Sequence, residues 1–161
     1  MRQLLQDIRG GETQLVDVPA PVNHPGCLLI QSVSSLVSLG TEKMMINFGK
    51  ANWINKARQQ PDKVRQVLEK ARVEGLFTTF NAVNAKLDQA IPLGYSNVGR
   101  IISVGKGVDG FSDGDLVVSN GPHAEIVSVE KNLVVRIPDS ISSEEACFSV
   151  VGSIGLQGIR L

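Results

Sequence analysis

One stretch of the chain has the letters of a dinucleotide-binding loop. Residues 105–110 read GKGVDG, which matches the pattern G-x-G-x-x-G. In a nucleotide-binding unit these glycines follow a strand and open a helix, and the N-terminus of that helix holds a pyrophosphate. A strand is predicted at 97–104, but the residues that follow, 111–118, are typical of a turn and another strand. We therefore interpret residues 105–110 as a hairpin turn rather than a cofactor site.

Histidine and cysteine side chains offer little metal chemistry. His24 and Cys27 form an H-x-x-C pair, but two ligands do not complete a metal site, so we expect an exposed histidine and a cysteine buried in a strand. Cys147 falls on an apolar helix face, where we expect it in the core rather than acting as a nucleophile.

The segment between Lys50 and Arg72 is strongly basic. Its cations outnumber its acids, Asp62 and Glu69, by five. The seven cations are Lys50, Lys56, Arg58, Lys63, Arg65, Lys70 and Arg72. Such a face, with Trp53 nearby, could receive a polyanion, a nucleotide-sugar phosphate or a partner domain. It could equally be the solvated surface of exposed helices, and the sequence leaves both interpretations open.

Short β-strands are predicted in the first and last thirds of the chain. Residues 14–18 and 28–37 are rich in β-branched and apolar side chains and end at loops that contain glycine or proline. Four further strands, separated by glycine-rich turns, are predicted at 97–104, 115–119, 124–129 and 133–137. This rhythm is typical of a small barrel or sandwich.

The middle of the chain is predicted to be helical. One apolar stripe at helical spacing is made of Val64, Val67, Leu68 and Ala71. Pro61 suits the first turn of this helix, and Gly75 can close it in a left-handed conformation. Two more helices are predicted at 50–59 and 81–89, so that residues 43–91 form a helical insertion in a β domain.

A last helix is predicted to begin at a capping box. Ser142 and Glu145 have the spacing at which each side chain accepts the backbone N–H of the other residue. This helix should carry Ala146, Cys147 and Phe148. The sequence then runs on in apolar residues punctuated by glycine, and we expect the natural chain to continue beyond residue 161.

Composition limits the kinds of protein that this sequence can encode. With 161 residues, 42% of them hydrophobic and 20% charged, the chain is long enough for one domain with its own core. A formal net charge of +0 and an aromatic content of 4% argue against nucleic-acid binding, and no apolar run is long enough to span a membrane. Two separated cysteines and the lack of a signal peptide favour the cytoplasm.

Several motifs, in the same order along the chain, resemble those of the medium-chain dehydrogenase/reductase superfamily. Residues 94–99 (GYSNVG) and 104–117 (VGKGVDGFSDGDLV) resemble its GHE and VG-x-GV-x-x-F-x-x-GDRV stretches. Residues 39–42 (LGTE) are similar to its CGTD motif, residues 121–125 (GPHAE) to GG-aromatic-AE, and residues 137–146 (IPDSISSEEA) to IPD-x-x-S-x-EEA. The long insertion is similar to that of bacterial bi-domain oxidoreductases that are often associated with polysaccharide gene clusters.

The resemblance implies a fold that is mainly β with α, namely a GroES-like β-barrel with a helical insertion, cut before a Rossmann domain. Residues 1–161 would be the GroES-like catalytic domain of a two-domain NAD(P)-dependent enzyme. The Rossmann domain, expected after residue 161, would bind most of the NAD or NADP. Expected partners are that domain and a small-molecule substrate, with a homo-oligomer left open and neither membrane nor nucleic acid expected.

The zinc ligands of the family have no counterparts in this sequence. The cysteine position falls on Leu39 and the histidine position on Tyr95, and neither side chain suits a zinc site. The third ligand position lies near Gly152, with no Cys or His after Cys147, and no four-cysteine loop lies between residues 118 and 124. The resemblance therefore implies a zinc-independent enzyme.

Three residues are the catalytic candidates that the resemblance implies. Thr41 matches a hydroxyl that relays protons, although a threonine after glycine also serves as a turn or cap. Glu42 stands where an acid supports the metal-bound histidine, and here it would orient Tyr95 or pair with a base. Tyr95 could donate a proton to a developing alkoxide, or could bond to the barrel wall as a buried side chain. His123 fills an aromatic position of the family, where we expect packing or a hydrogen bond.

Two functions follow from these residues. The first is the N-terminal catalytic domain of a zinc-independent, NAD(P)-dependent dehydrogenase/reductase that acts on a carbonyl, an alcohol or an activated alkene, sugar derivatives included. The isolated domain is expected to be inactive, because it lacks the hydride carrier. The alternative is a non-catalytic binding module that retains the barrel and binds an anionic partner through the basic insertion.

Overall fold

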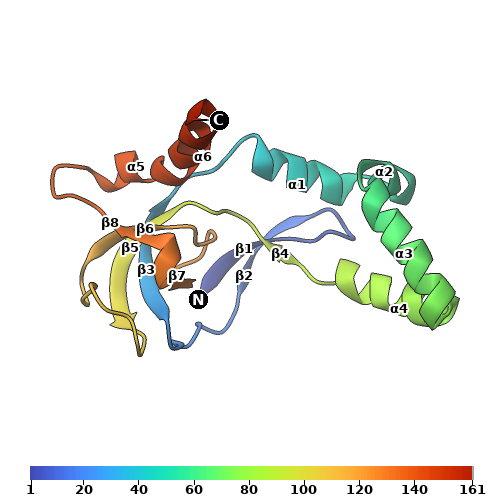
Figure 1. Ribbon diagram of the computed structural model, residues 1–161, viewed down its shortest axis with the longest axis horizontal. Helices are drawn as coiled ribbons and strands as arrows, with labels where there is room; N and C mark the ends of the chain where they lie inside the picture. The colour runs from blue at the N-terminus through green and yellow to red at the C-terminus, as the bar shows by residue number, and fades with distance from the viewer. Residues whose placement is uncertain (161) are drawn as a thin grey trace. The chain divides into compact units, whose positions relative to one another are not determined.

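A five-stranded antiparallel sheet carries the main core of the protein. The computed structural model describes residues 1–160, apart from nine side chains in the helices between residues 53 and 87. Along the sheet the strand order is β7 (Ile126–Glu130), β3 (Cys27–Ser35), β5 (Asn97–Val104), β6 (Leu116–Ser119) and β8 (Val134–Arg136) (Figure 1). These are five of the six predicted strands, and their ends fall within two residues of the predicted bounds.

Alternating apolar side chains place the core on one face of this sheet. On the central strand β3, Leu28 and Ile30 are buried, and across the ladder Leu28 pairs with Val129 while Ile30 pairs with Val127. On the other side of β3, Ile30 pairs with the buried Ile101 of β5. The two-residue period of a strand brings these side chains to the same face, so they pack into one cluster.

A second core cluster, made of Val98, Val118, Ala146 and Cys147, joins β5 and β6 to a short helix near the end of the chain. Helix α5 (Ser143–Ala146) begins at the predicted capping box, in which Glu145 N donates to Ser142 Oγ at 3.2 Å and Ser142 N donates to Glu145 Oε2 at 3.0 Å. The helix ends at Ala146, earlier than predicted, because the N–H of Phe148 bonds to the carbonyl only three residues back, at Glu145. Helix α6 (Ser149–Arg160) follows.

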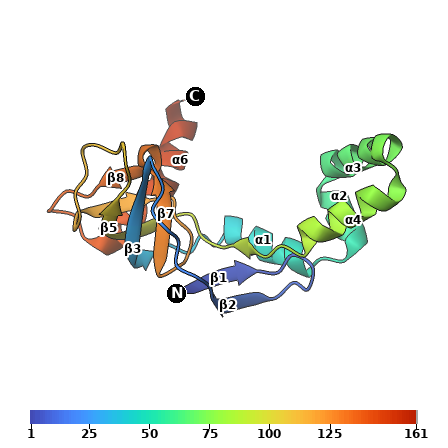
Figure 2. The same cartoon turned by 90° about the horizontal axis from the view of Figure 1, so that it is seen from below.

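A smaller, three-stranded sheet has the order β2 (Thr13–Asp17), β1 (Arg2–Gln6) and β4 (Ile91–Pro92), and Figure 2 shows β1 beside β2. Strand β2 was predicted at 14–18. Strands β1 and β4 were not predicted, because β4 has only two residues and β1 pairs with it across about half of the sequence.

The contacts divide the chain into two compact units. The first comprises Met1–Leu4, Leu15–Leu39 and Pro92–Leu161, and the second comprises Leu5–Gln14 and Gly40–Ile91. The helices of the second unit are α1 (Thr41–Lys50), α2 (Trp53–Gln59), α3 (Pro61–Glu74) and α4 (Leu76–Leu87). In the part of the chain that is described, no helix has the length and apolar character needed to cross a membrane.

Three of these helices were predicted, with differences at their ends. Helix α3 begins at Pro61 as expected, and Gly75 closes it with φ +91°. Its ψ of 153° is extended, however, and not the left-handed helical value that we predicted. Helix α2 begins three residues later than expected, and α4 begins before the predicted range 81–89. Helix α1 was not predicted.

Candidate functional site

Tyr95 is mounted between buried neighbours in the first unit. Leu93 and Ser96 are 1% exposed and Asn97 is 0% exposed, whereas Tyr95 itself is half-buried. On the C-terminal side, Leu36 N donates to Ser96 O at 3.0 Å, and Ser96 Oγ donates to Cys147 O at 2.5 Å. The tyrosine therefore sits on a backbone that is fixed from the end of β3 and from the turn after α5.

His123 fixes the other side of Tyr95. Its backbone N donates to Leu93 O at 2.8 Å, and its Nδ1 lies 2.8 Å from Ser35 Oγ. The imidazole ring also lies against Gly94, where a Cβ would come within 2.6 Å of His123 Cδ2. The predicted packing or hydrogen bond of this histidine is confirmed, and the histidine makes both.

A layer of buried polar groups continues from Ser96 into the sheet. Asn97 Nδ2 donates to Ser32 Oγ at 2.8 Å, while Asn97 Oδ1 is one of three buried side-chain oxygens without a hydrogen-bond partner among the described residues. Ser34 Oγ lies 3.2 Å from Cys147 Sγ, and Cys147 is buried as predicted. These serines could not be singled out from the sequence, because nothing in a single chain distinguishes them from surface serines of a strand.

Thr41 and Glu42 belong to the second unit, and Tyr95 belongs to the first. Thr41 is exposed and is the first residue of α1, and the N-cap is Gly40, so the capping role considered for Thr41 falls on its neighbour. Glu42 lies in the first turn and is 4% exposed. The positive end of the helix dipole favours a carboxylate at that place.

An exposed ion pair joins β1 to Glu125, two residues after His123. Arg2 donates to Glu125 through its backbone N at 2.8 Å and through Nε at 2.7 Å. The backbone N–H and the guanidinium of Arg2 hold the pKa of the Glu125 carboxyl below its ordinary value. Because both side chains are exposed, the pair helps to order this edge but adds little stability.

Residues 105–110 form the predicted turn between β5 and β6. Gly107 and Gly110 have φ values of +82° and +81°, and strand β6 begins at Leu116 with no helix in this fully described segment. At Gly105, a Cβ would clash with the carbonyl oxygen of His24 and come within 2.5 Å of that of Cys27. Close backbone packing thus explains this glycine, and the loop lacks the helix N-terminus that would hold a pyrophosphate.

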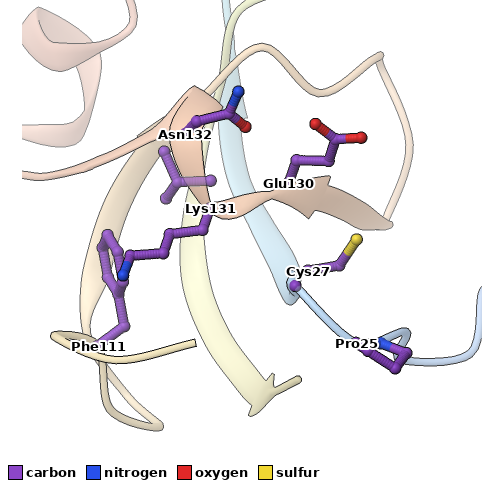
Figure 3. Close-up of a pocket in the computed structure, with 8 residues that line it drawn as sticks. Pro25, Cys27, Phe111, Glu130, Lys131 and Asn132 are labelled. Atoms are coloured by element: carbon purple, nitrogen blue, oxygen red, sulfur yellow. The ribbon is translucent and has the colours of Figure 1, made fainter. Parts of the chain in front are cut away.

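An open depression of about 680 Å³ lies elsewhere on the first unit. Figure 3 shows Phe111 and Lys131 on one side of it and Pro25 and Cys27 on the other. Lys131 bonds to Asp109, which lowers the pKa of that carboxyl. Of the residues that the structure describes, its lining includes none of the three predicted catalytic residues, so we do not assign the depression to catalysis.

The H-x-x-C pair behaves as two separate residues. His24 is exposed, as predicted, but Cys27 is half-buried where a buried thiol was expected. The reason is its place as the first residue of β3, at the edge of the depression and opposite Glu130. Among the described residues, no group of three or more His, Cys, Asp or Glu side chains is arranged to hold a metal ion.

The basic segment does not present all its charges in the same way. Lys56 is buried at 9% exposure, and its Nζ donates to the carbonyl oxygen of Ile8 at 2.6 Å. Arg65 lies 3.5 Å from Glu69 in an exposed pair one helical turn apart. Lys63 and Arg72 are exposed on α3. The cationic surface is therefore smaller than the count of charges along the sequence indicates.

No protein-family model matches the chain, and no curated protein matches its sequence. Among solved structures, galactitol-1-phosphate dehydrogenase from Escherichia coli is similar with a TM-score of 0.62 at 17% identity, over 92% of this chain and 41% of that chain. A quinone oxidoreductase from Coxiella burnetii has a TM-score of 0.61 at 19% identity, over 91% of this chain and 40% of that chain.

A third similar structure is the Escherichia coli quinone oxidoreductase complexed with NADPH, with a TM-score of 0.60 at 15% identity over 92% of this chain and 37% of that chain. The fold expected from the motifs is confirmed. It is a mixed α/β fold with two antiparallel sheets, consistent with a GroES-like domain, and it is shared with these solved structures. The chain spans about 40% of the length of the first of these relatives.

Proposed function

We propose that this chain is the substrate-side domain of a zinc-independent, NAD(P)-dependent oxidoreductase that acts on a carbonyl, an alcohol or an activated alkene. The fold supports this assignment, because the solved structures that share it include a quinone oxidoreductase, a galactitol-1-phosphate dehydrogenase and an enoyl reductase. The observation that carries the proposal is Tyr95, a half-buried phenol that lies between the buried, hydrogen-bonded residues Leu93 and Ser96.

Tyr95 would act as the proton donor. When the carbon of a carbonyl is reduced, its oxygen gains negative charge, and a phenol O–H within hydrogen-bonding distance can supply the proton that makes the alcohol. A group that must meet a reacting atom works best on a rigid support, because small errors in position are costly to the rate. Thr41, as a relay hydroxyl, and Glu42, as an acid, remain the other proposed catalytic residues.

The nicotinamide cofactor would be bound mainly by a Rossmann domain that follows residue 161 in the parent protein. Residues 105–110 do not fit a pyrophosphate, since the turn leads into a strand. The chain alone is therefore expected to lack activity. The proposed location is the cytoplasm. The candidate substrates include a sugar derivative of the kind used in polysaccharide synthesis.

Calorimetry with NADH and NADPH tests this proposal, on the protein encoded by the complete gene and on residues 1–161 in parallel. Binding by the complete protein and not by residues 1–161 is the expected result. Tight binding by residues 1–161 would show that the 105–110 turn binds the cofactor after all. If neither protein binds either nucleotide, the oxidoreductase assignment is wrong.

A binding module is the second candidate, and the exposed cations of α3 are the observation that favours it. Lys63, Arg65 and Arg72 are exposed on a helix that also exposes apolar side chains such as Leu68. An anionic partner would bind there. Replacing all three cations by glutamine would abolish that binding and leave nucleotide binding by the complete protein unchanged, so the two functions can be separated.

A further inference from the structure

We infer that His123 is a positioning residue for Tyr95, and that it acts through its ring on Gly94 and is itself held by Ser35. The kinetic part of this inference rests on the proposed function of Tyr95. The structural part, that His123 sets the conformation of Tyr95, does not.

Three backbone hydrogen bonds form a closed cycle around this point. Leu4 N donates to His123 O at 2.9 Å, His123 N donates to Leu93 O at 2.8 Å, and Leu93 N donates to Leu4 O at 3.0 Å. The cycle ties together three segments that are distant in sequence. Tyr95 follows two residues after Leu93, so its N-terminal side is anchored through His123.

The His123 ring limits what the residue before Tyr95 can do. Gly94 has φ +90°, which favours glycine, and a Cβ there would lie 2.6–2.8 Å from the ring and backbone N of His123. Because glycine has no side chain, its backbone is conformationally flexible unless neighbouring groups restrain it. The imidazole lying against residue 94 therefore provides the restraint that the missing side chain cannot.

Ser35 fixes the orientation of that ring. Its Oγ lies 2.8 Å from His123 Nδ1, and a hydroxyl can either donate to or accept from an imidazole nitrogen. The bond therefore survives in either tautomer. Since Ser35 is the last residue of β3, the ring is tied to the central strand of the sheet.

The restraint reaches Tyr95 because its other side is already fixed. Ser96 is held by Leu36 N and by the carbonyl of Cys147. On the Gly94 side, the His123 ring limits how far the tyrosine backbone can move. Removing the ring of His123 should shift the phenol, and displacements of about 1 Å are enough to lower rates by about 100-fold.

The chain offers a direct test, because Tyr95 is its single tyrosine. In protein labelled with ring-¹³C tyrosine, one set of aromatic signals reports Tyr95 alone. His123→Ala removes the ring, His123→Phe keeps a ring without Nδ1, and Ser35→Ala removes the hydroxyl. Ser140→Ala, on the exposed turn before α5, is the control.

We expect the Tyr95 signals to shift most in His123→Ala and less in His123→Phe and Ser35→Ala, with no change in Ser140→Ala. Ser35→Ala should have no further effect in the His123→Phe background, since both remove the same hydrogen bond. Unchanged Tyr95 signals in a folded His123→Ala protein, or additive effects in the double variant, would overturn the inference. If His123→Ala does not fold, the Ser35 and Phe variants decide the question by the same criterion.

Kinetics of the complete protein separate this inference from the proposed function. With a carbonyl substrate, kcat should fall about 10-fold or more in His123→Ala while KM changes less than about twofold, because orientation and not binding is lost. Rescue of most of the rate by His123→Phe is expected. Shifted tyrosine signals in a protein that binds no nucleotide would refute the oxidoreductase proposal and leave the positioning role standing.

Discussion

Arg136 and Asp115 meet at a single oxygen atom. Arg136 Nε and Nη2 lie 2.9 and 2.5 Å from Asp115 Oδ2, and the backbone N of Ser112 donates to the same oxygen at 2.7 Å. The guanidinium, and then the Ser112 N–H, hold the pKa of the Asp115 carboxyl below its ordinary value. The arginine also lies over the ring of Phe111, 5.6 Å from its centre, so the cluster joins β8 to the turn before β6.

This pair makes acid stability depend on Asp115. A carboxyl whose pKa is lower in the folded than in the unfolded protein contributes stability that is complete above its unfolded pKa, about 3.9. That contribution is lost as the pH falls through the folded pKa. We therefore expect Asp115→Asn to lower the urea midpoint near neutral pH and to flatten its decline below about pH 4.

The exposed Asp113, in the same turn, provides the matched control. Urea midpoints of Asp113→Asn should follow those of the wild type at every pH. If Asp115→Asn and the wild type show the same difference in midpoint at neutral and at acid pH, the carboxylate is not what stabilises this turn.

The core under the main sheet is tested by two neighbouring isoleucines. Ile101 is 2% exposed and packs in the core, whereas Ile102 is 40% exposed on the other face of β5. Ile101→Ala should lower the free energy of unfolding by about 2–5 kcal/mol because it leaves a cavity. Ile102→Ala should cost about 1 kcal/mol or less. Equal losses in chemical denaturation would contradict the register of β5.

Two glycines distinguish a structural turn from a cofactor loop. At Gly105 a Cβ meets backbone oxygens, so Gly105→Ala should cost about 1–3 kcal/mol through overpacking. At Gly107 there is open space and a φ of +82°, and Gly107→Ala should cost about 1–2 kcal/mol through backbone strain. Neither change should alter the affinity of the complete protein for NADPH in calorimetry. A large loss of affinity in the less destabilised variant would restore the cofactor role of this loop.

Local patterns were enough to predict much of the fold. The β-branched and apolar residues of β3, the apolar stripe of α3 and the capping box at Ser142 are each local signals, set by residues close together in sequence. Strand β1 lacked such a local signal. It lies between β2 and β4 in the sheet, and β4 is far from it in sequence. The GroES-like barrel was predicted from motifs because their order along the chain is itself a long-range signal.

The candidate site was only partly accessible from sequence. Tyr95 could be selected because it stands at a motif position. The residues that position it could not, since Ser35, Gly94 and His123 come from three separate segments and meet only in the folded sheet. The half-buried state of Cys27 was missed for a related reason: β3 begins one residue before the predicted strand, and the sequence does not show that this end lies at the edge of the depression.

Tyr95→Phe is the substitution that bears most directly on the proposed chemistry. It removes one oxygen atom and keeps the ring, so the buried neighbours Leu93, Ser96 and Asn97 should hold their places and the melting temperature should stay within a few degrees. If Tyr95 donates the proton, kcat for carbonyl reduction by the complete protein should fall about 100- to 10,000-fold, with KM and nucleotide affinity little changed. Thr41→Val should lower kcat as well if its hydroxyl relays that proton. Full activity in a correctly folded Tyr95→Phe protein would mean that another group supplies the proton, and Tyr95 would then be a wall residue of the barrel.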